Sequence, residues 1–390
     1  MGNKKQFLLN KVITLLDSKK FYGKADIIYN SVKIEIPRVF SLIENPEETI
    51  LKLKQIYSSM MNLNIVNIEF DYSKCEQLGL CASSVTDILV LNALKYRKFK
   101  NSKVYTHGNA PKTKEAFDIF FISGLPNHLG IINYQNKNVK KLDIIKNEPQ
   151  DKMSEKIIEY YNECLLTQHY SLSPEGKNIF GIMIGEVLDN AKNHGGKLST
   201  YYAAGHFNIE EGCEHGKCRL VLFNFGDSIY ESLNSDDTTE YTKKQLKEKI
   251  KEQTSFFNRK WNAEPLSTLY SLQYNVSSKR KSQHDNRGKG TIKLINSFMQ
   301  IGQNNEGKKP KMAIISGRCH ILFDTTYNLK EEIIDGKKVP IIAFNEENDL
   351  SKAPDTNYVK KIEEYFPGTM ISIEFYLDRK YIESQMEANK

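Results

Sequence analysis

The clearest pattern in the chain is a run of apolar residues with helical spacing that ends in two glycines. The apolar positions are Ile179, Phe180, Met183, Ile184, Val187, Leu188 and Ala191. Glu186, Asn190 and His194 stand four positions apart, so on a helix they form one polar stripe beside the apolar one. Gly195 and Gly196 then end the helix. A carboxylate one turn from a carboxamide can take a proton from water while the amide oxygen holds Mg²⁺. The alternative is the polar outer face of an ordinary amphipathic helix.

Residues 21–140 alternate between strand-like and helix-like patterns. The expected strands are Val32–Ile36, Ile65–Phe70 and Lys103–Tyr105, and the expected helices are Glu47–Leu63, Ser84–Lys95 and Lys112–Ser123. This alternation predicts a small α/β layer domain. An amphipathic helix within residues 1–20 precedes it, either as an N-terminal cap or as a partner-binding helix.

A second domain is expected over residues 171–380. Residues 135–152 are polar and basic with little periodicity, which predicts a linker, and a helix follows at Ser154–Gln168. We therefore assign residues 141–170 to a linker and connecting helix. The strands expected beyond it are Leu198–His206, Lys217–Asn224, Met312–Ile315, Cys319–Phe323 and Gly368–Phe375.

Glycines mark two places in this second domain where a backbone can approach a ligand. One is Gly226, just after a strand that ends at Asn224; the other is the pair Gly288 and Gly290, which opens an apolar helix. Free N–H groups at such a helix start attract phosphates. The stretch around the pair is basic: Lys279, Arg280, Lys281, Arg287 and Lys289. These side chains can neutralise a triphosphate, or they belong to a solvated loop.

Two further features lie around the central strands of this domain. Lys243–Gln253 is predicted to be a charged helix with a thin apolar stripe of Leu246 and Ile250. Cys213, His215 and Cys218 are close enough in sequence to suggest zinc, but a structural site needs four ligands, and a reduced hairpin loop explains them as well.

Composition excludes several classes of protein. The 390 residues include 39% hydrophobic ones, which is typical of a globular chain. No apolar run is long enough for a membrane helix, and no signal peptide is evident, so we expect a cytoplasmic protein. Six unevenly spaced cysteines fit reduced thiols. A net charge of +7 permits nucleic-acid contact without arguing for it.

Residues 21–140 resemble STAS domains, the fold of anti-anti-sigma factors, in which a Ser-bearing helix start follows a strand. Val66–Phe70 corresponds to the strand, and Leu80–Val85 (Leu-Cys-Ala-Ser-Ser-Val) to the helix start, without the acid and glycine that the family often has there. Phe121–Leu125 is similar to the closing helix and turn. The resemblance implies that Ser83 or Ser84 is phosphorylated. Without it, both serines are expected to be N-cap residues.

Residues 170–378 resemble the GHKL ATPase superfamily of gyrases, heat-shock chaperones, histidine kinases and MutL. Glu186–Gly195 is similar to the Glu-x-x-x-Asn-Ala-x-x-His-Gly motif of the anti-sigma factor kinases. The fold implied is a two-layer α/β ATP-binding sandwich with a long lid insertion over about 230–290. Glu186 would then activate the attacking water or hydroxyl, and Asn190 would hold Mg²⁺. The nucleotide-binding set implied by the resemblance is Asn190, Asn193, His194, Asn224, Gly226, Lys279, Arg287, Gly288, Lys289, Gly290, Thr291 and Thr369.

One departure from that family affects base recognition. The family has an Asp that accepts a hydrogen bond from the adenine amino group, and this chain has Asn224 in its place. An amide oxygen can still accept that bond, but it is uncharged and must be oriented. Asn224 is otherwise a strand-end turn former.

We expect a cytoplasmic signalling switch that binds Mg-ATP, hydrolyses it and passes the state of its lid through the STAS-like domain to a protein partner. Two alternatives stay open. One is a Ser/Thr kinase of the anti-sigma type, and the other is a regulator without catalysis. The partner's identity and homodimer formation also stay open.

Overall fold

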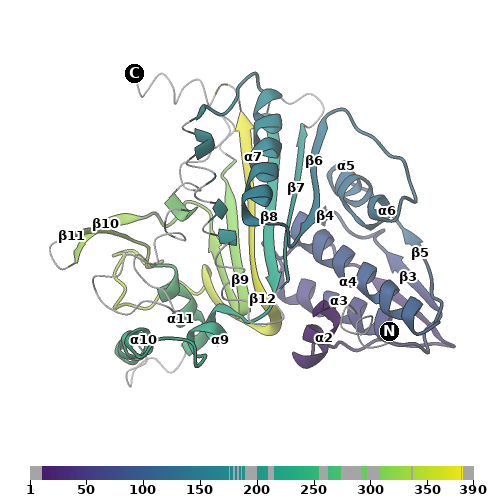
Figure 1. Cartoon of the computed structure of the whole chain (residues 1–390), viewed down its shortest axis with the longest axis horizontal. Coiled ribbons are helices and arrows are strands. Elements are labelled where there is room, and N and C mark those ends of the chain that lie inside the picture. Colours follow the sequence, from purple (N-terminus) through teal and green to yellow (C-terminus); the bar gives the residue numbers. More distant parts are fainter. Residues whose placement is uncertain are drawn as a thin grey trace.

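The computed structural model describes residues 11–174, 176–178, 181, 184–185, 187–188, 200–209, 215–253, 262–273, 292, 294–296, 298, 308–334, 337–378 and 380. This part of the chain is a mixed α/β structure in which a large antiparallel sheet is packed on one face against a smaller α/β layer and on the other against helices (Figure 1). No helix within these ranges is long and apolar enough to cross a membrane.

The smaller layer, residues 11–128, is here called the N-terminal layer. Its elements in chain order are α2 (Lys11–Ser18), β1 (Ser31–Glu35), β2 (Val39–Phe40), α3 (Pro46–Met61), β3 (Asn67–Asp71), β4 (Gln77–Leu78), α4 (Leu80–Phe99), β5 (Tyr105–Asn109), α5 (Lys114–Asp118), a π-helical turn (Ile119–Ser123) and α6 (Leu125–His128). Strands β1, β3 and β5 form a parallel sheet, and β2 pairs with β4. A strand, a short strand and a helix thus occur twice in succession.

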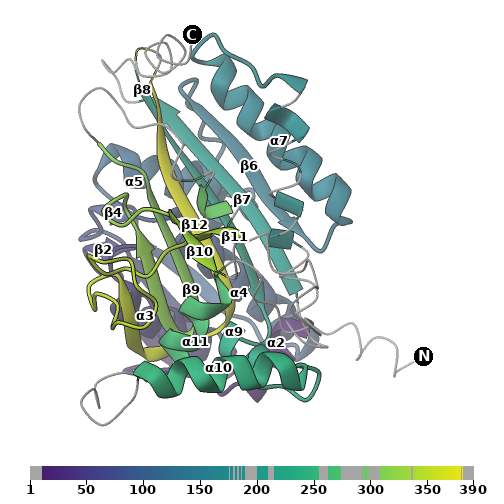
Figure 2. The same ribbon diagram turned by 90° about the vertical axis from the view of Figure 1, so that its left-hand side faces the viewer.

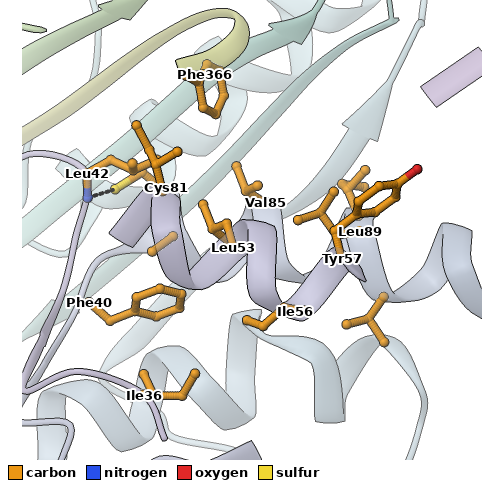
Figure 3. Packing of buried hydrophobic residues seen from close by; sticks show 14 of the residues in the cluster. Ile36, Phe40, Leu42, Leu53, Ile56, Tyr57, Cys81, Val85, Leu89 and Phe366 are labelled. Carbon is orange, nitrogen blue, oxygen red and sulfur yellow. Dashed lines mark hydrogen bonds between the residues drawn. The ribbon is translucent and has the colours of Figure 1, made fainter. Parts of the chain in front are cut away.

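Helices α3 and α4 pack together and form most of the core of this layer. Pro46 at the first helical position and two glutamates in the first turn favour the start of α3. Its apolar positions face inward as the spacing predicted, and Figure 3 shows Leu53 and Ile56 of α3 beside Val85 of α4, with Phe366 of the large sheet above them. The helix prediction for this segment is confirmed.

The prediction that Ser83 and Ser84 are N-cap residues is wrong. Helix α4 begins at Leu80, with Gly79 at its N-cap, so both serines lie inside the helix. Both are buried, and residues 80–90 of the helix are buried on all sides, which is why its start could not be identified from periodicity.

The large sheet has five antiparallel strands in the order β6-β7-β8-β12-β9. Their bounds are β6 (Val139–Lys146), β7 (Thr200–Ile209), β8 (His215–Phe225), β12 (Val359–Asp378) and β9 (Lys311–Phe323). The expected linker over 135–152 is wrong where it includes β6. That strand pairs only with β7 among the described strands, and lysines on such an edge strand hide the alternation of a strand.

Helices and a hairpin complete the described part. They are α7 (Gln150–Leu166), α9 (Ile229–Leu233), α10 (Glu240–Gln253), α11 (Ala263–Ser271) and the strands β10 (Lys330–Ile334) and β11 (Lys337–Ile341). Figure 2 shows α10 lying across one end of the sheet, next to α9 and α11. Leu246 of α10 packs with Leu233, Leu266 and Tyr270, so the predicted thin apolar stripe is confirmed.

Side chains alternate between two faces of the large sheet, which we call the layer face and the helical face. The layer face packs against the N-terminal layer through Tyr202, Ala204, Val221, Phe223, Phe225 and Met370. The helical face packs against α7, residues 184–188 and residues 292–298 through Ala203, Phe207, Leu220, Leu222, Ile373 and Phe375. The N-terminal layer and the sheet therefore share one continuous apolar core.

Charged side chains also lie between the N-terminal layer and the layer face, where Arg219 is buried and its charged neighbours are half-buried. Arg219 of β8 pairs with Glu115 of α5 and lies 3.7 Å (Nε–Oε1) from Glu374 of β12, while its Nη1 donates to Asn208 Oδ1 at 2.8 Å. Lys217 Nζ lies 2.9 Å from Glu374 Oε2 and 3.2 Å from Glu115 Oε1. Burial alone would raise the pKa of Glu374, but the two cations outweigh burial and lower it. We call these five residues the interface cluster.

Candidate functional site

Three polar side chains lie in register across neighbouring strands at one end of the helical face. Thr369 of β12 is paired with Asn224 of β8 on one side and with Ser316 of β9 on the other. The Thr369 amide donates to Asn224 Oδ1 at 3.0 Å, and the hydroxyl oxygens of Thr369 and Ser316 are 2.7 Å apart. Asn224 and Ser316 are buried and Thr369 is half-buried. We call this set the polar row.

Glycines beside the polar row allow close approach of the strands. Gly368 has a φ of +125°, and a Cβ there would lie 2.1 Å from the carbonyl oxygen of Asn224. Gly317 has a φ of +60°, and a Cβ there would meet a Glu264 carboxylate oxygen at 2.2 Å. Only glycine fits these two positions without strain. The Glu264 carboxylate in turn accepts the Arg318 amide at 2.7 Å, which fixes the backbone just after Ser316.

The loop after Asn224 leads directly into α9, which is held on the polar row. Ser228 is the N-cap of α9 and forms a capping box with Glu231. The Ile229 amide donates to Ser316 Oγ at 2.8 Å, and Tyr365 donates to Glu231 Oε2 at 2.8 Å. The position of α9 is therefore tied by hydrogen bonds to both neighbouring strands, β9 and β12.

The same loop is connected to the N-terminal layer by Lys19, which follows α2. Lys19 Nζ lies 3.1 Å from Asp227 Oδ1 and 2.8 Å from Glu231 Oε1. Burial alone would raise the pKa of Glu231, but hydrogen bonds from Lys19, the Ser228 amide and Tyr365 outweigh it, and the pKa is lowered. Glu231 is thus held as a carboxylate between α2, α9 and β12.

The helical face also anchors the two segments that border the predicted motifs. Ile184, Val187 and Leu188 lie in the same buried cluster as Leu222 and Ile373 of the sheet. The cluster also contains the apolar residues after the glycine pair, namely Ile292, Leu294, Ile295 and Phe298. The apolar helix expected after Gly290 is confirmed at those positions. Both segments therefore pack on the face that carries the polar row.

Of the sequence-predicted site, the structure brings together Asn224, Gly226 and Thr369. The remaining predicted residues lie outside the described part of the chain: Glu186, Asn190, Asn193, His194, Lys279, Arg287, Gly288, Lys289, Gly290 and Thr291. The sequence prediction missed Ser316, Glu231 and Lys19. The available signal for Ser316 is a Ser-Gly pair inside an apolar strand. The expected strands Met312–Ile315 and Cys319–Phe323 leave that pair out, whereas the structure has one strand, β9, through it.

Two other candidate sites from the sequence look different in the folded chain. His215 and Cys218 lie on β8 three positions apart, so their side chains point to opposite faces, and Cys213 lies outside the described residues. Within the described ranges, no three His, Cys, Asp or Glu residues are grouped to hold a metal ion. The buried Ser83 and Ser84 are closed to an incoming kinase as long as α4 is folded.

Comparison with known proteins finds no matching family model, no significantly similar curated protein and no significantly similar solved structure.

Proposed function

We propose that this protein is a Mg²⁺-dependent nucleotide-binding switch, with ATP as the nucleotide that its sequence resemblance implies. The observation that carries the proposal is the polar row. Asn224 and Thr369 are 145 positions apart in sequence, belong to the nucleotide-binding set that the resemblance implies, and are hydrogen-bonded neighbours on the sheet. A buried polar set of this kind on an otherwise apolar face is typical of a ligand site.

The segments around the row support the same proposal. The helix residues next to Glu186 and those after Gly290 pack on the helical face. This arrangement is consistent with a base near the polar row and with phosphates between Asn190 and the glycines Gly288 and Gly290. In the proposal, Glu186 accepts a proton from the attacking water and Asn190 binds Mg²⁺.

The contacts of Lys19 suggest how the bound state would reach the rest of the molecule. A nucleotide that moves the loop after Asn224 would act on Asp227 and Glu231, and through Lys19 on α2. Contacts that differ between the nucleotide-bound and the nucleotide-free state would supply the free energy of the switch. In the proposal, a protein partner then binds the N-terminal layer and responds to its state. Self-phosphorylation at Ser83 or Ser84 is less well supported, because both serines are buried.

The test is a titration of the full chain with Mg-ATP by calorimetry, followed by measurement of phosphate release. We expect the wild-type chain to bind and to hydrolyse ATP. Glu186→Ala should keep the affinity and lower turnover by roughly 100-fold or more, since it removes a general base. Glu159→Ala, on the exposed side of α7, is the matched control and should change neither.

Three outcomes separate the alternatives. Absence of both heat and thermal stabilisation with ATP and GTP would overturn nucleotide binding. Binding without phosphate release would favour a regulator without catalysis. Wild-type turnover in Glu186→Ala would show that another group is the base.

A further inference from the structure

The orientation of the Asn224 side chain is fixed by its contact with β12. The backbone amide of Thr369 can only donate, so the atom 3.0 Å from it must be the Asn224 oxygen, Oδ1. The amide nitrogen, Nδ2, therefore occupies the other branch of the planar group. This assignment does not depend on telling oxygen from nitrogen by shape, because only one of the two atoms can accept.

The Nδ2 group still has hydrogen bonds to give. It carries two hydrogens and no acceptor capacity, and no residue in the described part of the chain accepts a hydrogen bond from it. Asn224 is only 2% exposed, so solvent reaches its side chain very little and an acceptor placed against Nδ2 would be favourable. A bound group with a carbonyl oxygen would satisfy it.

An aspartate at this position would behave differently. One carboxylate oxygen would accept the Thr369 amide, and the second would present an acceptor to the exocyclic amino group of adenine. In this chain the second position is a donor. Adenine would place its amino group against the Asn224 amino group, and neither hydrogen would find an acceptor.

On the basis of the nucleotide site proposed above, we propose that it selects 6-oxopurine nucleotides, with a guanine or hypoxanthine base, over adenine nucleotides. Asn224 Nδ2 donates to the carbonyl oxygen at position 6 of the base. Asn224 Oδ1 remains bonded to the Thr369 amide. The residue thus acts as a specificity determinant whose orientation is set by the pairing of β8 with β12.

The test compares ATP, ITP and GTP, each with Mg²⁺, in calorimetric titrations of the full chain. ITP carries a carbonyl where ATP carries an amino group at position 6, its N1 carries a hydrogen where adenine N1 is an acceptor, and the rest of the two nucleotides is the same. We expect ITP or GTP to bind at least about tenfold more tightly than ATP, because a site built around one hydrogen-bond pattern rejects its inverse.

Two matched variants locate the effect. Asn224→Asp should reverse the preference in favour of ATP. Asn208→Asp is the control, since Asn208 is another buried asparagine whose oxygen accepts a hydrogen bond, but it lies on the layer face beside Arg219. It should leave the base preference unchanged. Thermal unfolding of each variant establishes that it is folded.

The outcomes distinguish this inference from the function on which it rests. If wild-type protein binds ATP at least as tightly as both ITP and GTP, the base preference is wrong and nucleotide binding stands. If it binds none of the three, the proposed function fails and the preference fails with it. The affinities of wild-type protein for ATP, ITP and GTP test the base preference even if Asn224→Asp does not fold.

Discussion

The two faces of the large sheet use buried polar groups in opposite ways. On the layer face, Arg219 and Lys217 lie between Glu374 of the same sheet and Glu115 of the N-terminal layer, so both cations have carboxylates beside them. On the helical face, the polar row is uncharged, and within the described part of the chain Asn224 bonds through its side-chain oxygen only. The ion pairs of the layer face join the sheet to the N-terminal layer, whereas a polar side chain that keeps donor capacity can receive a ligand.

The largest effect is expected from breaking the interface cluster. Arg219→Met removes a buried cation and leaves Lys217 as the one cation of the interface cluster beside Glu115 and Glu374, so the free energy of unfolding should fall by about 3–5 kcal/mol. Urea denaturation measures this loss. Arg38→Met is the control, because Arg38 and Glu76 form an exposed pair whose removal should change stability by less than about 1 kcal/mol. Equal losses in both variants would contradict the account of the layer face.

A smaller effect is expected at the end of the helical face, beside the polar row. Gly317→Ala adds a methyl group against Glu264 and Ser228 at a positive φ. We therefore expect crowding and backbone strain together to lower the free energy of unfolding by about 3 kcal/mol. Gly130→Ala separates backbone strain from crowding, because Gly130 has a φ of +65° with no atom within 4 Å of the added carbon. Urea denaturation of the control should show the strain alone. A Gly317→Ala loss no larger than that of Gly130→Ala would mean that Glu264 and Ser228 move aside.

The smallest effect concerns a titratable pair inside the N-terminal layer. His128 Nε2 of α6 lies 3.2 Å from Asp87 Oδ2 of α4. Burial raises the pKa of Asp87 to about 6. Burial lowers the pKa of His128, but the hydrogen bond and charge of Asp87 outweigh it, and the pKa is raised. Protonation of His128 is therefore easier in the folded chain than in the unfolded one, and its stabilising effect is lost as pH rises through the folded pKa.

His128→Gln should therefore reduce stability more at pH 6 than at pH 8. Urea midpoints at the two pH values give the comparison. His107→Gln removes an exposed histidine from β5 and should leave the pH dependence of stability unchanged. A His128→Gln loss that is the same at both pH values would show that the pair contributes no charge interaction to folding.

Local patterns predicted the helices and several strands because their apolar spacing is complete within one segment. Helix α3 was predicted in this way, and so were the apolar positions around Ile292 and Phe298. The pairing of Asn224 with Thr369 was anticipated only through motif order, because register between strands so far apart in sequence is not encoded locally.

The features that the sequence did not reveal all depend on neighbours from distant segments. Strand β6 looks polar because it lies at an edge, and the start of α4 is obscured because the helix is buried on most sides. Lys217 and Arg219 look like surface residues, but Arg219 is buried and Lys217 half-buried because α5 and β12 supply carboxylates. No periodicity within β8 indicates those partners.

The position of β12 has a consequence for how the chain is made. This strand comes last among the described strands, yet it lies between β8 and β9 and contributes Phe366, Met370 and Glu374 to the contact with the N-terminal layer. During synthesis the N-terminal layer therefore leaves the ribosome long before the strand that completes its packing surface. Until residue 378 has emerged, the edge of β8 that pairs with β12 remains uncovered, and an uncovered strand edge is open to aggregation in a nascent chain.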